Sequence, residues 1–273
     1  MTTREHGTPT SGAPPLPLHA GPEPGTFRVA IGPDHVYFDH HRVRGRALLP
    51  GVACLEFALR GAAAEHPDAP VHAVADAAWL RPVLADEVGD GLDLTLRRAG
   101  DMVEYTVALD GRSCATGALL LAAPDPLPTV SLEVRDRVGE NTRSCLPRGE
   151  VYAEFAVMGI DYRRYFQRIA YVQRHEQLSL AWLSNSDGTP LELTNLLDCA
   201  FQAGMAISIG EHRDSLMPFA MGRMLFHRPL DLPRAAVFVV TEKLSPFRTR
   251  FTVFDENYRP LVSVIDLGVR AAS

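Results

Sequence analysis

The feature that most constrains the fold is a pair of apolar helical segments, each inside a block of strand-like sequence. In the first segment, Val52, Leu55 and Leu59 follow Pro50 at close to helical spacing. A proline suits the first turn of a helix, because its missing N–H costs no hydrogen bond there. In the second, residues 193–204 form a broad apolar face. We therefore expect one long buried helix in each half of the chain.

The sequence around these helices has the pattern of antiparallel strands. Apolar side chains alternate at Val103, Tyr105 and Val107, as in a half-buried strand. Residues 251–254 and 261–265 flank the polar segment 255–257, which predicts a hairpin. A sheet with one apolar face can bury a long helix by wrapping around it. The pattern predicts an α+β fold in which two such halves lie side by side.

The domain boundaries follow from local composition. Residues 1–25 are rich in Pro, Gly, Thr and Ala and are predicted to be a disordered tail. Residues 126–148 contain prolines and little periodicity, which predicts a linker. The first half is then expected over residues 26–125 and the second over residues 149–273. The initiator methionine favours a free-standing protein.

Charge and cysteine usage narrow the class of protein. A net charge of -6 argues against nucleic acid as the main partner. No apolar run approaches the roughly 20 residues of a membrane helix, and the N-terminus lacks the order of a secretory signal. The four cysteines are far apart and match neither a metal site nor a dense disulfide framework. We expect a protein of the reducing cytoplasm.

The first candidate site residue is His41, which lies shortly before a tight turn and the helix start at Pro50 and Gly51. The early N–H groups of a helix have no partner inside the helix, and its dipole favours negative charge there. A thioester carbonyl held at that point would be stabilised as it becomes enolate-like. A neutral histidine beside it could take the α-proton, because its pKa lies near working pH.

The second candidate is Asp198, which interrupts the apolar face of the second helix. Gln202 is four residues further on and shares its face. Burial of a carboxyl group in an apolar tunnel raises its pKa. The Asp198 carboxyl could then stay protonated and donate to a leaving hydroxyl, while Gln202 orients it.

These residues carry a family resemblance. His41, Gly45 and Pro50 fit the HxxxGxxxxP motif of polyketide-synthase dehydratases, and Asp198 and Gln202 fit their DxxxQ motif, in the family's order. Residues 79–83, 216–230 and 251–270 also resemble family segments. The resemblance covers roughly residues 27–270.

The resemblance implies a double hotdog fold with the active site between the halves. His41 would be the base and Asp198 the acid in removing water from a β-hydroxyacyl chain during polyketide biosynthesis. An acyl carrier protein would present that chain as a thioester on its phosphopantetheine arm, and no metal or diffusible cofactor is implied. Substrate contacts are expected from the residues that complete the motifs, Gly45, Pro50, Gly51, Tyr162 and Gln202. The oligomeric state stays open between a monomer and a homodimer.

Three departures from the family pattern bear on the reaction. The usual Tyr-Gly-Pro-x-Phe motif keeps Tyr162 and Phe166 but has Arg163 and Arg164 in place of Gly-Pro. Leu193-Thr194 stand where His-Pro is usual before the acid, and position 40 is His where Asp is more usual. These changes leave substrate size and reaction type open more than they affect the fold.

Other interpretations compete with dehydration. A double-bond isomerase or an oxa-Michael cyclase could use the same scaffold, and a non-catalytic partner could bind the acyl chains of a synthase. A hotdog thioesterase fits the motifs less well.

Single residues near these motifs also have more than one interpretation. Tyr162 could either pack in the core or contact the substrate, and Tyr152 is expected to be structural. The spacing of the histidines at 35, 40 and 41 matches no known type of metal site. Arg163 and Arg164 belong to basic clusters that are either a solvated face or a dock for an acidic carrier protein.

Overall fold

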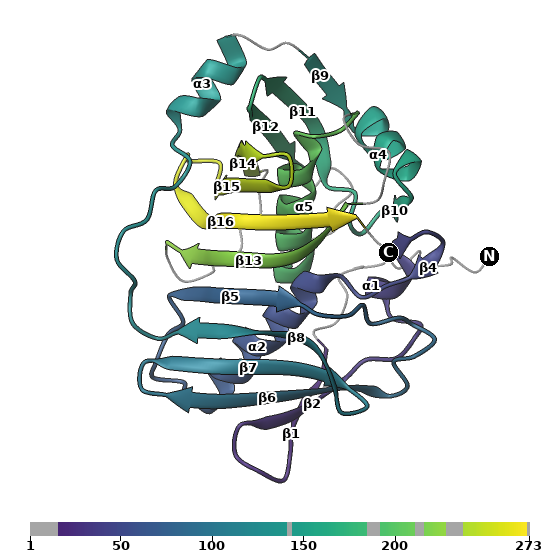
Figure 1. Cartoon of the computed structure of the whole chain (residues 1–273), viewed down its shortest axis with the longest axis vertical. Coiled ribbons are helices and arrows are strands. Elements are labelled where there is room, and N and C mark those ends of the chain that lie inside the picture. The colour runs from purple at the N-terminus through teal and green to yellow at the C-terminus, as the bar shows by residue number, and fades with distance from the viewer. Residues whose placement is uncertain (1–15, 141–143, 185–191, 211–215, 228–236, 272–273) are drawn as a thin grey trace, which may run out of the picture.

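The structure, a computed structural model, describes residues 16–140, 144–184, 192–210, 216–227 and 237–271. Two halves of similar architecture lie side by side, each a sheet with one long helix packed against it (Figure 1). This is the predicted double hotdog arrangement. The chain also forms the short helices α1 (Val36–Asp39), α3 (Glu133–Glu140) and α4 (Arg148–Val157).

The first half packs helix α2 (Gly51–Glu65) against an antiparallel sheet. The strand order is β1-β2-β6-β7-β8-β5. The bounds are β1 (Leu18–Ala20), β2 (Thr26–Ala30), β5 (Ala73–Trp79), β6 (Gly91–Ala99), β7 (Met102–Leu109) and β8 (Arg112–Leu120). Helix α2 contacts β6, β7 and β8, the centre of this sheet, so its apolar residues form the core of the first half.

The second half repeats this plan with helix α5 (Leu193–Ala206). The strand order is β13-β16-β15-β14-β12-β11-β9. The bounds are β9 (Ser144–Pro147), β11 (Ile169–His175), β12 (Leu178–Leu183), β13 (Leu216–Phe226), β14 (Val237–Ser245), β15 (Arg248–Phe254) and β16 (Pro260–Ala271). A capping box starts α5: the Glu192 side chain accepts from the Asn195 N–H, and the Asn195 side chain accepts from the Glu192 N–H at 2.9 Å.

The two half-sheets are joined through their edge strands. Strand β5 pairs antiparallel with β13, with Ala75 opposite Arg223, and the described residues form one continuous 13-stranded sheet. Both edges thereby satisfy backbone N–H and C=O groups that would otherwise be exposed. On the same side of this sheet, α2 and α5 contact each other where the halves meet (Figure 1).

A second, three-stranded sheet connects the two halves around His41 and Tyr162. It has the order β10-β3-β4, from β3 (His41–Val43), β4 (Arg46–Ala47) and β10 (Ile160–Tyr162). The two-residue loop between β3 and β4 has positive φ at both Arg44 (50°) and Gly45 (79°), which is the geometry of a type I′ hairpin. The pairing of β3 with β10 sets His41 opposite Tyr162 across the two halves.

The structure confirms the predicted helices, the strand around Val103 and the hairpin of residues 251–265. The predicted tail is wrong for residues 16–25, because β1 pairs with β2 and Leu16 is buried; residues 1–15 lie outside the described part. The predicted linker contains α3 and β9, and Val138 of α3 packs in a small core with Leu180 and Phe238. The divisions at residues 126 and 149 stay predictions.

Phe251 provides a test of the core of the second half. It is buried on β15, and its ring packs edge-on against Phe201 of α5 at 5.7 Å. We expect Phe251→Ala to lower the free energy of unfolding by about 3–5 kcal/mol, the usual cost of a large cavity. Urea denaturation would measure this, with Phe247→Ala on the same hairpin as the control. Phe247 is exposed and its loss should change stability by less than about 0.5 kcal/mol; equal effects would contradict the packing.

Candidate active site

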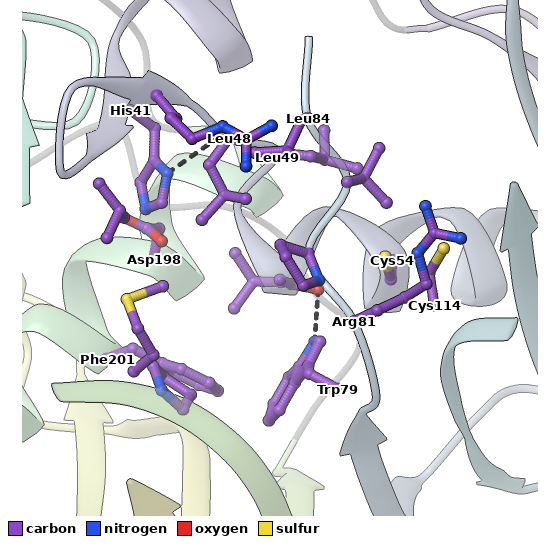
Figure 2. A pocket seen from close by; sticks show the side chains of 18 of the residues that line it. His41, Leu48, Leu49, Cys54, Trp79, Arg81, Leu84, Cys114, Asp198 and Phe201 are labelled. Atoms are coloured by element: carbon purple, nitrogen blue, oxygen red, sulfur yellow. Dashed lines mark hydrogen bonds between the residues drawn. The ribbon is translucent and has the colours of Figure 1, made fainter. Parts of the chain in front are cut away.

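Side chains from both halves line one cavity of about 270 Å³. His41, Gly51 and Trp79 come from the first half, and Tyr162, Asp198 and Phe201 come from the second. Figure 2 shows His41 and Asp198 close together on one side of the cavity, with Trp79 and Phe201 below and Cys54, Arg81 and Cys114 on the far side. Most of the wall is apolar, so a group held inside is largely removed from water.

His41 is the first residue of β3, and only 3% of its surface is exposed. Its Nδ1 lies 3.0 Å from the carbonyl oxygen of Leu48 (Figure 2). A carbonyl can only accept, so Nδ1 carries the hydrogen and Nε2 keeps a lone pair. The rings of Tyr162 and Phe166 pack edge-on against the imidazole at 5.3 and 5.9 Å. The ring is therefore held in one tautomer and one orientation.

Asp198 lies on α5 and is 7% exposed. Gln202 donates from Nε2 to Asp198 Oδ2 at 2.7 Å, as the sequence predicts, and to the Phe166 carbonyl at 3.1 Å. The other side of this amide faces Tyr152, whose hydroxyl lies 3.1 Å from Gln202 Oε1 and accepts the Ile169 N–H at 3.0 Å. These contacts fix which way the amide points, so Tyr152 acts beyond simple packing. Gln202 thus holds one carboxyl oxygen of Asp198.

Burial shifts the pKa values of His41 and Asp198 in opposite directions. Desolvation lowers the pKa of His41, and the attraction of the nearby Asp198 carboxylate only partly offsets this. Desolvation raises the pKa of Asp198, and the attraction of His41 and the Gln202 hydrogen bond only partly offset that. Both shifts favour the neutral forms: an imidazole that can accept a proton and a carboxylic acid that can donate one.

The N-terminus of α2 forms another part of the wall. Gly51 and Val52 line the cavity, and Pro50 is the residue that precedes the helix. Trp79 Nε1 donates to the Gly51 carbonyl at 2.8 Å, and a Cβ atom at Gly51 would lie only 2.7 Å from that nitrogen. Glycine is therefore required for this approach. The first N–H groups of α2 have no acceptor within the helix, and its dipole makes this end positive.

The other predicted residues divide into two groups. Tyr162 is buried and lines the cavity. Gly45 lies in the β3–β4 turn and Pro50 precedes α2, and neither is among the residues that line the cavity. Gln202 is not among them either and donates to Asp198. The substrate contacts of these three residues stay predictions.

The two arginines predicted to dock a carrier are both exposed and lie outside the cavity wall. Arg163 lies 2.6 Å from a carboxylate oxygen of Asp39 and 3.7 Å from one of Asp161. These acidic neighbours compensate much of its charge. The docking role of Arg163 and Arg164 stays a prediction.

Several residues of the cavity wall are not among the site residues predicted from the sequence. Phe201 and Met205 are three and seven positions after Asp198, so helical spacing could have found them. Strand residues carry no such local signal: Trp79 ends β5, and Arg270 lies near the end of β16. Four arginines line the cavity, at positions 44, 46, 81 and 270.

The residues that the structure describes contain no group of three or more His, Cys, Asp or Glu side chains placed to hold a metal ion. None of their helices combines the length and the apolar character needed to cross a membrane.

Known proteins resemble this chain in sequence. The family described as "Polyketide synthase dehydratase domain" matches residues 19–109, and the one described as "Polyketide synthase dehydratase N-terminal domain" matches residues 133–273. Polyketide synthase PksN of Bacillus subtilis is 27% identical over 225 residues, which is 74% of this chain and 4% of PksN. Polyketide synthase ThaG of Burkholderia thailandensis is 41% identical over 73 residues, 25% of this chain and 1% of ThaG. The chain thus spans only a small part of these relatives.

Solved structures agree on the fold. A dehydratase domain of a trans-AT polyketide synthase from Brevibacillus brevis superposes with a TM-score of 0.79 at 17% identity, covering 96% of this chain and 100% of that one. The dehydratase domain from the CurF module of the curacin polyketide synthase gives a TM-score of 0.78 at 19% identity, with the same coverage of both chains. With a family match over more than half of its length, the chain belongs to the polyketide synthase dehydratase family.

Proposed function

We propose that this protein removes water from a β-hydroxyacyl thioester carried by an acyl carrier protein, with His41 as the base and Asp198 as the acid. The observation that carries the proposal is the pairing of these two buried side chains, from opposite halves, in one apolar cavity. Membership of the dehydratase family supports the same reaction.

In the proposed reaction, the thioester carbonyl lies at the N-terminus of α2 near Gly51, where helix N–H groups stabilise negative charge on its oxygen. His41 Nε2 takes the α-proton, and the C–H electrons form the new double bond. The β-carbon–oxygen bond breaks as Asp198 gives its proton to the hydroxyl, which leaves as water. His41 ends protonated and Asp198 ionised, and proton exchange with solvent restores both.

A solved relative supports the role of the histidine. The structure of the CurJ dehydratase bound to a compound is that of an inactive histidine-to-phenylalanine mutant. That domain gives a TM-score of 0.73 with this chain at 17% identity. In this chain, His41 is the histidine that lines the cavity.

The carrier arm brings a phosphate to the cavity, and arginines in the wall fit that group. Arg44 and Arg270 both line the cavity, from the β3–β4 turn and from the C-terminal part of β16. Guanidinium groups bind phosphate with paired hydrogen bonds. We place the phosphopantetheine phosphate near these two residues rather than near Arg163, whose charge Asp39 already compensates.

The reaction itself is tested by mass spectrometry of carrier-bound β-hydroxyacyl substrate. The wild type should produce a species lighter by one water. His41→Phe and Asp198→Asn should each slow this by about 10²- to 10⁴-fold, because each removes one proton-transfer group. His19→Phe and Asp161→Asn, at exposed positions, are the controls and should keep wild-type rates.

Other products would overturn the proposal. A product of unchanged mass with altered chromatography would indicate isomerisation or ring closure. Binding of the acyl chain with no product at all would indicate a non-catalytic partner. Full activity in both His41→Phe and Asp198→Asn would show that the site assignment is wrong.

The protonation state of His41 is tested by NMR titration of labelled histidine. The pKa of His41 should lie below the ordinary value of about 6.5, because burial disfavours the cation. Asp198→Asn should leave it below that ordinary value, because asparagine is neutral, like the protonated acid that the proposal assigns to Asp198. Asp39→Asn is the matched control: it should lower the pKa of His40, which Asp39 raises, and leave that of His41 unchanged. A His41 pKa above 6.5 would contradict its role as a neutral base.

The phosphate contact is tested by comparing two substrates. Arg270→Gln and Arg44→Gln should each raise KM for carrier-bound substrate about tenfold, since a hydrogen bond to a charged group contributes about 1.5 kcal/mol or more. KM for a short thioester without phosphate should not change. Arg98→Gln, at an exposed position of β6 outside the cavity wall, is the control. If Arg163→Gln and Arg164→Gln instead show the larger carrier-specific effect, the phosphate lies on the other arginine pair.

A further inference from the structure

Helix α2 carries a buried carboxylate that the proposed reaction does not use. Glu56 is only 8% exposed and belongs to the helix packed in the core of the first half. A buried glutamate is costly unless it is hydrogen-bonded or paired. One of its oxygens accepts from the Thr194 hydroxyl and lies 3.5 Å from the Tyr37 hydroxyl. The other lies 3.6 Å from Arg60 on the next turn of α2. The contact with Thr194 crosses from the first half to the second.

Thr194 lies on the same face of α5 as the proposed acid. Positions 194, 198 and 202 are four residues apart and follow one stripe along the helix. All three side chains are buried. Thr194 is bonded to Glu56 of α2, and Gln202 lies against the Tyr152 hydroxyl of α4. Asp198 therefore lies between two anchored residues, one turn from each.

The start of α5 is held by more than this one bond. Glu192, which caps the helix, accepts a hydrogen bond from the Tyr165 hydroxyl. The rings of Tyr165 and Tyr37 pack at 5.8 Å, and Tyr37 also approaches Glu56. The first turn of α5 thus belongs to a buried polar cluster that is centred on two carboxylates and shared by both halves. Such a fully engaged cluster specifies one arrangement of its elements.

We infer that Glu56 is a positioning residue: by binding Thr194 it fixes the register of α5 against α2, and so the place of Asp198 relative to His41 and the N-terminus of α2. The reason is geometric. The carbonyl site lies on α2 and the acid on α5, and a slide or rotation of one helix against the other would separate them. The inference rests on the proposed function for its kinetic consequence only.

The contact depends on the hydroxyl of Thr194, which donates to Glu56 Oε2 from the second residue of α5.

The test replaces the hydroxyl while keeping the shape. Thr194→Val should lower kcat for carrier-bound substrate about 10- to 100-fold, the cost of a misplacement near 1 Å, and change KM by less than about twofold. Thr194→Ser restores the donor and should recover most of kcat. Arg60→Gln, which removes the ion pair at the other oxygen of Glu56 and a hydrogen bond to the Leu16 carbonyl, and Thr106→Val on the sheet are controls that should keep the wild-type kcat.

A second readout does not need activity. Asp198 lies beside His41 in the cavity (Figure 2), so moving Asp198 should shift the NMR resonances of the His41 imidazole in Thr194→Val and leave those of the exposed His19 unchanged. NMR spectra of labelled histidine measure this even if the reaction is not dehydration, so failure of the two proposals can be told apart. If Thr194→Val does not fold, Thr194→Ala gives the same two readouts. An unchanged kcat and unchanged His41 resonances in a folded variant, whatever its melting temperature, would reduce Glu56 to a purely structural role.

Discussion

Edge-to-edge pairing of β5 with β13 is the interaction on which the rest of the molecule depends. Each half alone would bury one face of one helix and leave a strand edge open. Pairing the two edges aligns the half-sheets, and this alignment brings α2 and α5 into contact on the same side. The cavity forms where those helices meet, so neither half contains it. The small sheet made by β3 and β10 adds a second tie and sets His41 against Tyr162.

Within that cavity, burial shifts the pKa values of two ordinary side chains in opposite directions. The same burial that lowers the pKa of His41 raises that of Asp198. Hydrogen bonds then select geometry: the Leu48 carbonyl fixes the imidazole tautomer, and Gln202 fixes one carboxyl oxygen. The polar clusters around Glu56 and Tyr152 lie outside the cavity wall but hold the helix that carries Asp198.

The sequence predicts the fold well where the signal is local. Helical spacing locates α2 and α5, and alternation locates β7 and the β15–β16 hairpin. The positions of His41 and Asp198 follow from motifs beside those helices. The composition of residues 16–25 predicts a disordered tail, but a short edge strand is defined by pairing with its partner strand rather than by its own composition. Arg270 and Trp79 reach the cavity only because of how distant strands pair, which no single segment encodes.

The opposite pKa shifts of His41 and Asp198 have a consequence for the charge balance of turnover. Before the proposed reaction the two groups are a neutral imidazole and a neutral acid; after it they are an imidazolium and a carboxylate. The sum of their charges is zero in both states, so the buried site never holds an uncompensated ion. Each desolvated charge appears only together with its counterion, whose attraction is strongest in a medium of low polarity. Proton transfer in the proposed reaction therefore adds no net charge to the cavity.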